Sequence, residues 1–405
     1  MPSRVILLSG CLAASLALPR PTFAQDPTTE AGAAKIHVGP IGLSPTLTVG
    51  NIGVDTNVFN TSTDPTRDFT VSFLPATGEW LPLGPLLLSG KTGAPLTYFQ
   101  KSTTQRSVGF EQDGRAALNL VHLTPFVAGS YASTYSQPTA EITARVQQVT
   151  TSVTAGARFR LGPSTTLDAS YVSGSVRLPD AVVFGVDLGR QLDRNITSFN
   201  ATFRMALSPL TTFAVKSTLE RDRFDSVAVR NTNSLSVVPG FEFKPDGRLS
   251  GRVYVGLKGV RPLSPLVPPF TGVVASAALS WLARETTRID GKMDRDIDYS
   301  IDESTPLFLA TSVNLSVTQI LVGHVDAIGR IGRTLLNYQN VLSSAGGVPL
   351  AGRTDRTNTV GSGLGYRFSI DARVGFEADY VRRVSALDGF SYSGWQFGGT
   401  MTYGF

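Results

Sequence analysis

The sequence predicts an all-β protein, a transmembrane up-and-down antiparallel β-barrel of about 16 strands, with 14 and 18 as the alternatives. Three observations predict it. The chain opens with a secretory signal, continues in segments of alternating polarity joined by turns, and ends in an aromatic strand. No apolar run beyond residue 24 approaches the roughly 18 residues of a spanning helix. If the chain crosses a bilayer, it therefore does so with strands that close on themselves.

The N-terminal segment has the order of a secretory signal peptide. Arg4 precedes the apolar stretch 5–18, and the small residue Ala24 follows in a more polar segment. We expect cleavage after Ala24, so residues 1–24 are the predicted signal. The segment ending at Cys11 is the alternative, a lipoprotein box, but the apolar stretch continues beyond it. Since Cys11 is the only cysteine, the remaining chain offers no thiol for a disulfide, a metal or a nucleophile.

The remaining chain divides into a lead-in and a barrel. Residues 25–41 have no period and few apolar side chains, so we expect a flexible periplasmic lead-in there, and residues 42–405 form the predicted barrel. From about residue 149, six pairs of alternating segments are each joined by one short turn, as at Gly162-Pro163-Ser164. The connections between pairs are longer and richer in Pro, Asp, Asn and Ser. Short turns on one side and long loops on the other are typical of bacterial outer-membrane barrels, with the short turns periplasmic.

The strand number follows from these pairs. The six pairs give 12 strands, and a first strand near Leu43 and the terminal strand make 14. Residues 66–135 alternate poorly and contain prolines in 81–90, so one further pair is assigned to them. Bacterial barrels have an even number of strands, which gives 16. A secreted sandwich or solenoid is the soluble alternative, but its strands would be shorter.

The C-terminal segment 391–405 alternates between an apolar and a polar parity, with Gln396 and Thr400 on the polar one. A strand between lipid and a wet lumen needs these two faces. Its ending resembles the assembly signal of bacterial outer-membrane proteins, carried by Gly398-Gly399 together with Trp395, Phe397, Tyr403 and Phe405. We therefore expect the outer membrane of a Gram-negative bacterium as location, and outer-membrane lipid and the barrel-assembly machinery as partners.

Charges identify the predicted lumen. In the strand 287–299, Ile289, Met293, Ile297 and Tyr299 share one parity, with Arg295 as the charged exception, and six charged residues share the other. A basic residue facing lipid at the bilayer midplane costs about 2–4 kcal/mol, so the charged parity is assigned to the lumen. The same argument on three further strands completes the lumen-facing candidates, which are Lys216, Glu220, Asp222, Arg252, Lys258, Arg288, Asp290, Lys292, Asp294, Asp296, Asp298, Arg373, Glu377, Asp379 and Arg383.

Both signs of charge occur among the lumen-facing candidates, and two interpretations stay open. Opposed charges can create a transverse field along a hydrophilic path for polar solutes. Alternatively, charges on adjacent strands pair with one another and partly fill the interior. The second interpretation is the expectation for most individual residues.

Enzymatic and cofactor chemistry has little support in the sequence. His324 and Asp326 share a strand face and could orient one another, which leaves an outer-membrane hydrolase as the weakest alternative. The segment 389–394, GFSYSG, is not a nucleophile elbow. The acidic residues within 290–303 are spread along an extended strand, whereas calcium needs its oxygen ligands around one point. We predict no catalytic residue, no cofactor and no metal site. Without a run of Lys or Arg, nucleic acid is not an expected partner either.

One segment carries a family resemblance. Residues 37–60, HVGPIGLSPTLTVGNIGVDTNVFN, contain a Gly-Pro step, a proline-interrupted strand and the element Asp55-Thr56-Asn57-Val58-Phe59. They resemble the entry segment of the putative β-barrel porin 2 family, although Thr56 is an insertion relative to the tighter form of that element. The resemblance implies an outer-membrane barrel linked to surface or exopolysaccharide export, with no catalytic residues to transfer. Asp55 and Asn57 themselves are interpreted as a turn or strand-end polar pair.

Taken together, these features predict a passive polar pore for small solutes or for surface and exopolysaccharide export. The alternative is a non-conducting structural or binding protein that acts through its long extracellular loops, at 178–195, 261–272 and 337–356.

Overall fold

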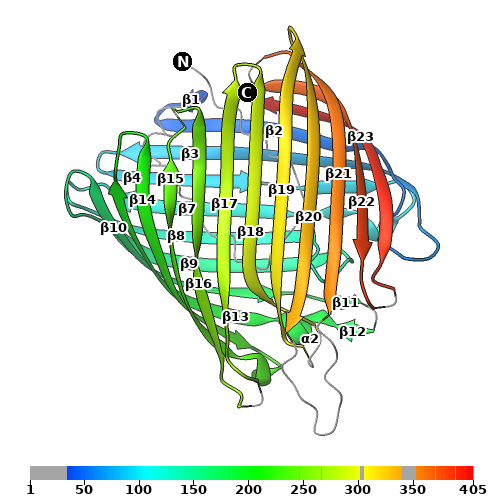
Figure 1. Ribbon diagram of the computed structural model, residues 1–405. Helices are drawn as coiled ribbons and strands as arrows, with labels where there is room; N and C mark the ends of the chain where they lie inside the picture. The colour runs from blue at the N-terminus through cyan, green and yellow to red at the C-terminus, as the bar shows by residue number, and fades with distance from the viewer. Residues whose placement is uncertain are drawn as a thin grey trace.

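The computed structural model describes residues 34–183, 185–245, 247–265, 267–301, 305–339, 353–369, 371–387 and 389–404. Long antiparallel strands curve into a closed barrel, and the described part of the chain begins and finishes at the same end of it (Figure 1). Each long strand pairs with its neighbour in sequence, and the last pairs with the first. None of the described helices is long and apolar enough to cross a bilayer. The predicted signal 1–24 and Phe405 lie outside the described residues.

In chain order, the strands are β1 (Ile36–Val38), β2 (Ile41–Asp55), β3 (Asp68–Leu83), β4 (Leu86–Gly93), β5 (Leu96–Phe99), β6 (Ser107–Val108), β7 (Phe110–Leu118), β8 (Leu123–Ser136), β9 (Val146–Arg160), β10 (Thr165–Arg177), β11 (Val182–Val183), β12 (Val186–Asp187), β13 (Arg194–Ala206), β14 (Thr211–Phe224), β15 (Thr232–Phe243), β16 (Leu249–Pro262), β17 (Phe270–Arg284), β18 (Thr287–Tyr299), β19 (Leu307–Val322), β20 (Val325–Gln339), β21 (Thr354–Arg367), β22 (Ala372–Val384) and β23 (Tyr392–Gly404). The helical segments are η1 (Thr103–Gln105), α2 (Leu188–Leu192) and η2 (Ala228–Arg230).

The barrel has 18 strands, the larger of the two alternatives to the expected 16, so the count of 16 is short by one hairpin. The main sheet contains 21 segments, but β1 is only a short arm folded onto the start of β2, and β4–β5 and β6–β7 are each one interrupted strand. Residues 66–135 therefore contribute four strands rather than two. The interruption at Ala94-Pro95 explains the error, because a proline inside a strand removes a ladder hydrogen bond and breaks the alternation.

The two ends of the barrel differ. Connections at the end that holds the termini, called the turn end, have two residues (84–85) to five (244–248). Connections at the other end, called the loop end, have seven (100–106) to sixteen (178–193). All six predicted hairpins are confirmed, from β9–β10 to β21–β22. Figure 1 shows α2 and the β11–β12 hairpin at the loop end.

Residues alternate between an outward and an inward face, as barrel strands require. On β14, for example, Leu219 is 54% exposed on the outward face, whereas Ala214 on the inward face is fully buried. The C-terminal aromatics lie outward, and the rings of Trp395 and Phe397 stack at 5.4 Å. The wall therefore presents apolar side chains to its surroundings.

The seam between β2 and β23 closes the barrel at an irregular site. Asn51 has a positive φ of 53°, and the register shifts between Val49 and Ile52, so β2 carries a bulge there. A Cβ on Gly53 would lie 1.8 Å from the Phe397 carbonyl oxygen. Only a glycine lets the two backbones approach this closely.

The Asp55–Asn57 element reinforces the same seam. The Asn57 amide N–H donates to Asp55 Oδ1 at 2.8 Å, so the two residues form a strand-end polar pair. The Asn57 side-chain amide donates to the Ser393 carbonyl at 3.0 Å, and the Gln396 side-chain amide donates to Asp55 Oδ2 at 2.8 Å. The element thus attaches the first long connection to the last strand.

Replacing Gly53 by Ala tests the seam. We expect Gly53→Ala to lower the yield of heat-modifiable, folded barrel and its urea midpoint, because the added methyl group clashes with the β23 backbone. Gly329→Ala is the matched control, since a Cβ at Gly329 on β20 meets nothing within 4 Å. Equal folding yields and midpoints for the two variants would contradict this description of the seam.

Candidate permeation pathway

The connection 137–145 between β8 and β9 folds into the barrel and crosses its loop end. Its Glu141 contacts residues next to β18 and β21. Six strands, β10 and β13 to β17, separate β9 from β18 around the wall. The contacts therefore form through the interior rather than along the wall.

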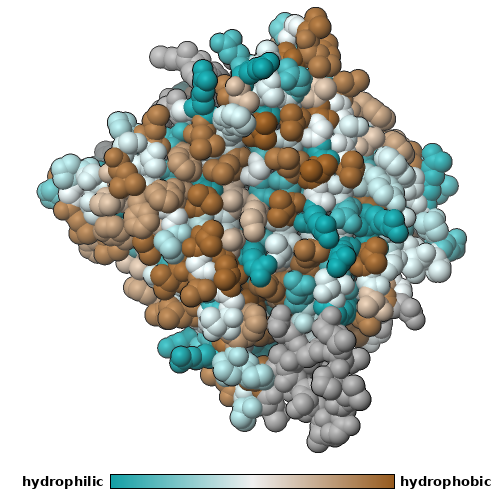
Figure 2. Space-filling model, in the orientation of Figure 1, coloured by the Kyte–Doolittle hydropathy of each residue, from teal (hydrophilic) through white to brown (hydrophobic). Residues whose placement is uncertain are grey.

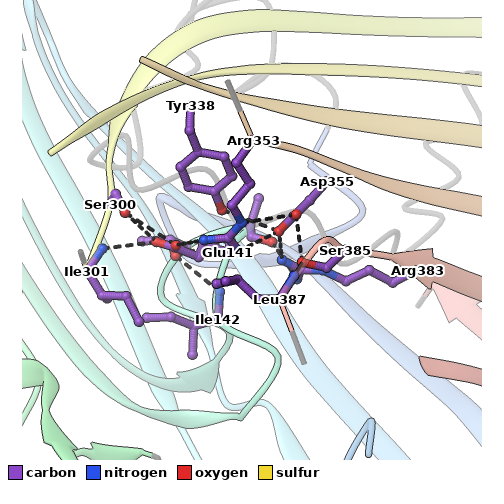
Figure 3. Close-up of polar contacts among 12 residues, drawn as sticks. Glu141, Ile142, Ser300, Ile301, Tyr338, Arg353, Asp355, Arg383, Ser385 and Leu387 are labelled. Atoms are coloured by element: carbon purple, nitrogen blue, oxygen red, sulfur yellow. Dashed lines mark hydrogen bonds and ion pairs between the residues drawn. The ribbon is translucent and has the colours of Figure 1, made fainter. Parts of the chain in front are cut away.

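Glu141 is the centre of these contacts (Figure 3). Its side chain is only 1% exposed. Its carboxylate accepts hydrogen bonds from Ser300 Oγ at 3.0 Å and from the Ile301 amide at 2.9 Å, and a guanidinium nitrogen of Arg353 lies 3.3 Å away. A buried carboxylate is tolerated only when its oxygens are paired in this way.

Asp355 at the start of β21 continues the network. Its carboxylate pairs with Arg353 at 2.7 Å and with Arg383 at 2.9 Å, and it accepts a hydrogen bond from Ser385 Oγ at 2.7 Å. Arg383 also donates to the Ala140 carbonyl at 3.0 Å. Burial acts to lower the pKa of Arg353, but its hydrogen bond to Asp355 holds that pKa above the usual value. We call Glu141, Ser300, Arg353, Asp355 and Arg383 the rim network.

An apolar cluster packs beside the rim network. It is formed by the connections 137–145 and 178–193 together with the strand ends next to them, and Leu188 and Leu192 of α2 are fully buried in it. Asp187 caps α2 by accepting a hydrogen bond from the Arg190 amide at 3.1 Å. Side chains of several connections thus pack together at the loop end.

The end of β18 corrects two sequence assignments. Ile297 and Tyr299, which the parity assigned to the outward face, are packed inside. The Tyr299 hydroxyl donates to Asp222 Oδ2 at 2.9 Å, and its ring meets Phe224 edge-on at 4.9 Å. The reason is that β18 pairs with β17 only as far as Arg295, and its residues 296–299 pair with β19 alone, so the parity of the complete wall does not extend to them.

One wall of the lumen, on β20 to β22, carries an ion-pair network. The fully buried Asp326 pairs with Arg367 at 2.6 Å and with Arg373 at 2.9 Å. Arg330 pairs with Glu377 at 2.6 Å and with Asp379 at 2.8 Å. These charges satisfy one another within the wall, as adjacent strands allow.

A second wall, on β9 to β16, has a similar arrangement. Arg204 bridges Asp168 and Glu242, and it lies 3.1 Å from the latter. The Tyr254 hydroxyl donates to Glu242. Lys216 lies 3.7 Å above the centre of the Tyr254 ring, where the face of the ring attracts a cation.

The lumen-facing candidates are distributed over these walls. Arg373, Glu377 and Asp379 belong to the β20–β22 wall and Arg383 to the rim network. Lys258 pairs with Asp296 at 3.1 Å, and Arg288 pairs with Asp290 at 2.9 Å. Glu220 and Asp222 share β14 and its inward parity with Lys216, Arg252 shares β16 with Lys258, and Lys292 and Asp294 share β18 with Asp290. Asp298 lies at the end of β18, beyond the part that pairs with β17.

Several important residues were missed in the sequence. Arg204 on β13, Asp168 on β10 and Arg330 on β20 could have been found by the same parity argument. Glu141 could not, because it lies in a connection where no period applies. Arg353 and Asp355 fall within the loop interval 337–356 that was assigned to a possible binding surface, and the structure places both of them in the rim network.

The suggested His324–Asp326 pair does not form. His324 lies in the turn before β20, with its ring 5.7 Å from that of Tyr366, whereas the Asp326 carboxylate is occupied by Arg367 and Arg373. Among the described residues, no group of three or more His, Cys, Asp or Glu is placed to hold a metal ion.

Comparison with protein-family models matches residues 130–403 to putative β-barrel porin 2. The chain belongs to this family. The matched range begins beyond the segment 37–60 that carries the family resemblance in the sequence, so the two observations are independent. A search of curated proteins found no match.

Similar solved structures include outer-membrane proteins. OccK2 (OpdF) of Pseudomonas aeruginosa has a TM-score of 0.50 at 11% identity, covering 89% of this chain and 97% of that one. OccK1 (OpdK) of the same organism has a TM-score of 0.50 at 10% identity, covering 90% and 98%. The FrpB iron transporter of Neisseria meningitidis reaches 0.44 at 9%, covering 85% of this chain, which spans 62% of that transporter. At these identities the likeness concerns the fold alone.

Asp355→Asn tests the rim network. Breaking a buried ion pair from one side costs about 3–5 kcal/mol, so we expect the Ile301 amide and the amides of 139–143 to exchange hydrogen at least about 100-fold faster. Asp225→Asn is the control, because its pair with Arg177 is exposed, with 40% and 33% of the two side chains accessible. Unchanged exchange in the Asp355 variant would show that the network does not hold the connection.

Proposed function

We propose that this member of the porin family is a bacterial outer-membrane pore that gives small polar solutes a passive route through its lumen. The observation that carries the proposal is the connection 137–145, which the rim network fixes across the loop end above walls of paired charges. A barrel of 16–18 strands is wide enough for an aqueous channel. An inward-folded connection then limits the size of what passes.

The rim network favours small solutes over a growing polysaccharide chain. Export of a polymer requires a continuous opening of constant width along the whole axis. In this barrel, Glu141 and Asp355 are both 1% exposed and paired with arginines. Releasing the connection would separate these buried carboxylates from their arginine partners, which costs several kcal/mol of free energy. A permanently narrowed mouth suits solutes of limited size.

The outward face supports a bilayer location. Leu219, Val255, Phe376 and Leu364 are each more than half exposed on it, and a closed barrel leaves no unpaired strand edge in contact with lipid. With the short turns in the periplasm, the rim network lies at the extracellular side.

A transport role rather than a catalytic one is part of the proposal. His324 and Asp326 are the one pair that suggested hydrolysis, but they have different partners. His324 lies beside an aromatic ring, and Asp326 lies between two arginines. His324→Ala is therefore expected to leave the solute permeability unchanged.

Single-channel recording in planar bilayers tests the pore. We expect discrete conductance steps for the wild-type protein and larger steps for Glu141→Ala, because the connection 137–145 loses its anchor to Ser300, Ile301 and Arg353. Asp371→Asn is the matched control, since Asp371 pairs with Lys35 in an exposed position at the turn end, and its steps should equal those of the wild type.

Two results would contradict the proposal. A correctly folded, electrically silent wild-type protein would favour the non-conducting alternative. Liposome swelling at equal rates in a monosaccharide and in a long oligosaccharide would contradict the size limit and favour polymer export.

A further inference from the structure

An arginine cluster lies on the outward face of β20 to β22, outside the lumen. Arg333, Arg356 and Arg382 are exposed, whereas their sequence neighbours Thr334, Asp355 and Arg383 are turned inward or buried. Arg333 is in register with Asn358, and Asn358 with Arg382. Figure 2 shows hydrophilic residues grouped over these strands within a largely apolar wall. We call the three residues the outer arginine cluster.

The three side chains are close enough to act on one ligand. Adjacent strands lie about 4.8 Å apart, so the backbones of Arg333 and Arg382, two strands apart, are separated by roughly 10 Å. Arg356 is on the strand between them, two residues further toward the loop end. The long side chains can therefore converge on a single headgroup carrying more than one negative charge.

No carboxylate neutralises the outer arginine cluster on its own wall. The described Asp and Glu residues of β20 to β23 all have the inward parity and form ion pairs with inward arginines. Among the described residues, Arg333, Arg356 and Arg382 form no hydrogen bond or ion pair with another side chain. The cluster is a concentrated positive charge that lacks a protein counterion in the described part of the chain.

The height of the cluster matches a membrane interface. β21 carries three outward apolar residues on the turn-end side of the cluster, Val360, Leu364 and Tyr366. Tyr366, the furthest of them, is ten residues from Arg356. Ten residues span about 33 Å along a strand, or about 25 Å along the axis of a barrel whose strands tilt by about 40°, the height of an outer-membrane apolar band. Arg356 therefore lies where the lipid headgroups of the loop-end leaflet begin, and Arg333 and Arg382 can extend toward the same level.

We propose that the outer arginine cluster binds a phosphorylated lipid of the extracellular leaflet, with two or more headgroup phosphates held by the three guanidinium groups. Planar guanidinium groups bind phosphate oxygens in pairs, which makes arginine better suited than lysine to this contact. The neighbouring apolar side chains Val360, Phe376 and Val384 provide a surface for acyl chains. The inference rests on the proposed outer-membrane location, but not on conduction.

Native mass spectrometry of the purified full-length barrel tests the inference, with bis-phosphorylated lipid A added as the probe. We expect the wild type to retain one lipid A per chain, and the triple variant R333Q/R356Q/R382Q to bind it at least tenfold more weakly. The control K244Q/R248Q/R284Q loses the same charge at exposed positions of the turn end and should bind like the wild type. R356Q alone is a milder variant in case the triple variant folds poorly, and about a threefold loss is expected for it.

Further measurements distinguish a phosphorylated lipid from free phosphate and from a second copy of this chain. Lipid A without phosphates should bind at least tenfold more weakly than the bis-phosphorylated form. Full displacement by millimolar inorganic phosphate would overturn the lipid assignment in favour of a free-phosphate site. A change from oligomer to monomer in the triple variant, with lipid binding intact, would overturn it in favour of a contact with a second copy of this chain. Equal binding by all variants would overturn it outright.

The conductance of the triple variant keeps this inference separate from the proposed pore. Since the outer arginine cluster lies outside the lumen, its steps in phosphatidylcholine bilayers should equal those of the wild type. A silent wild-type protein that still binds lipid A would contradict the pore and support the lipid site, and a conducting protein without lipid binding would do the reverse.

Discussion

The structure depends on the backbone pairing between β2 and β23. A sheet of this length must either leave two open edges or close, and an open edge in lipid would cost several kcal/mol for each unsatisfied backbone group. The bulge at Asn51 and the close approach of Gly53 to the Phe397 carbonyl bring the first and last strands into register. The hydrogen bonds of Asp55 and Asn57 to Gln396 and Ser393 then hold the loop end of the seam. Residues at the two ends of the sequence thereby make one continuous wall.

Closure also determines where the charges lie. Once strands alternate around a closed wall, every charged residue on the inward parity shares one enclosed space, and its least costly state is a pair with a neighbouring strand. Arg204 between Asp168 and Glu242, and Arg330 between Glu377 and Asp379, show this on two walls. The connections at the loop end follow the same rule, because Glu141 finds its partners only by crossing the interior. On the outward face of β20 to β22, the exposed arginines are Arg333, Arg356 and Arg382.

Much of the fold follows from local signals in the sequence, whereas the rim network does not. Turn residues such as Gly162-Pro163-Ser164 define the six hairpins because a hairpin is encoded by neighbouring residues. The β4–β5 strand was not predicted because Pro95 interrupts its alternation of polar and apolar residues. Tyr299 was assigned to the outward face because the parity argument assumes a strand with a neighbour on both sides. The Glu141 contacts join residues 159 to 212 positions apart, and no local pattern encodes such a pairing. The alternation of charged residues did identify charged residues that line the lumen, including Lys258, Arg373 and Glu377.

The central claim is that ions pass through the lumen, the space lined by the inward-facing side chains of the strands. Thr218 lies on that inward face, where its hydroxyl donates to Asn200 Oδ1 at 2.9 Å, and Leu219 is the adjacent outward residue. Cys11 is the only cysteine of the chain, so Thr218→Cys and Leu219→Cys each add one defined thiol. Single channels of both variants are recorded while a charged, water-soluble methanethiosulfonate reagent is added. We predict a stepwise fall in current for Thr218→Cys and none for Leu219→Cys. A current that is insensitive at position 218, or equally sensitive at both positions, would contradict the claim.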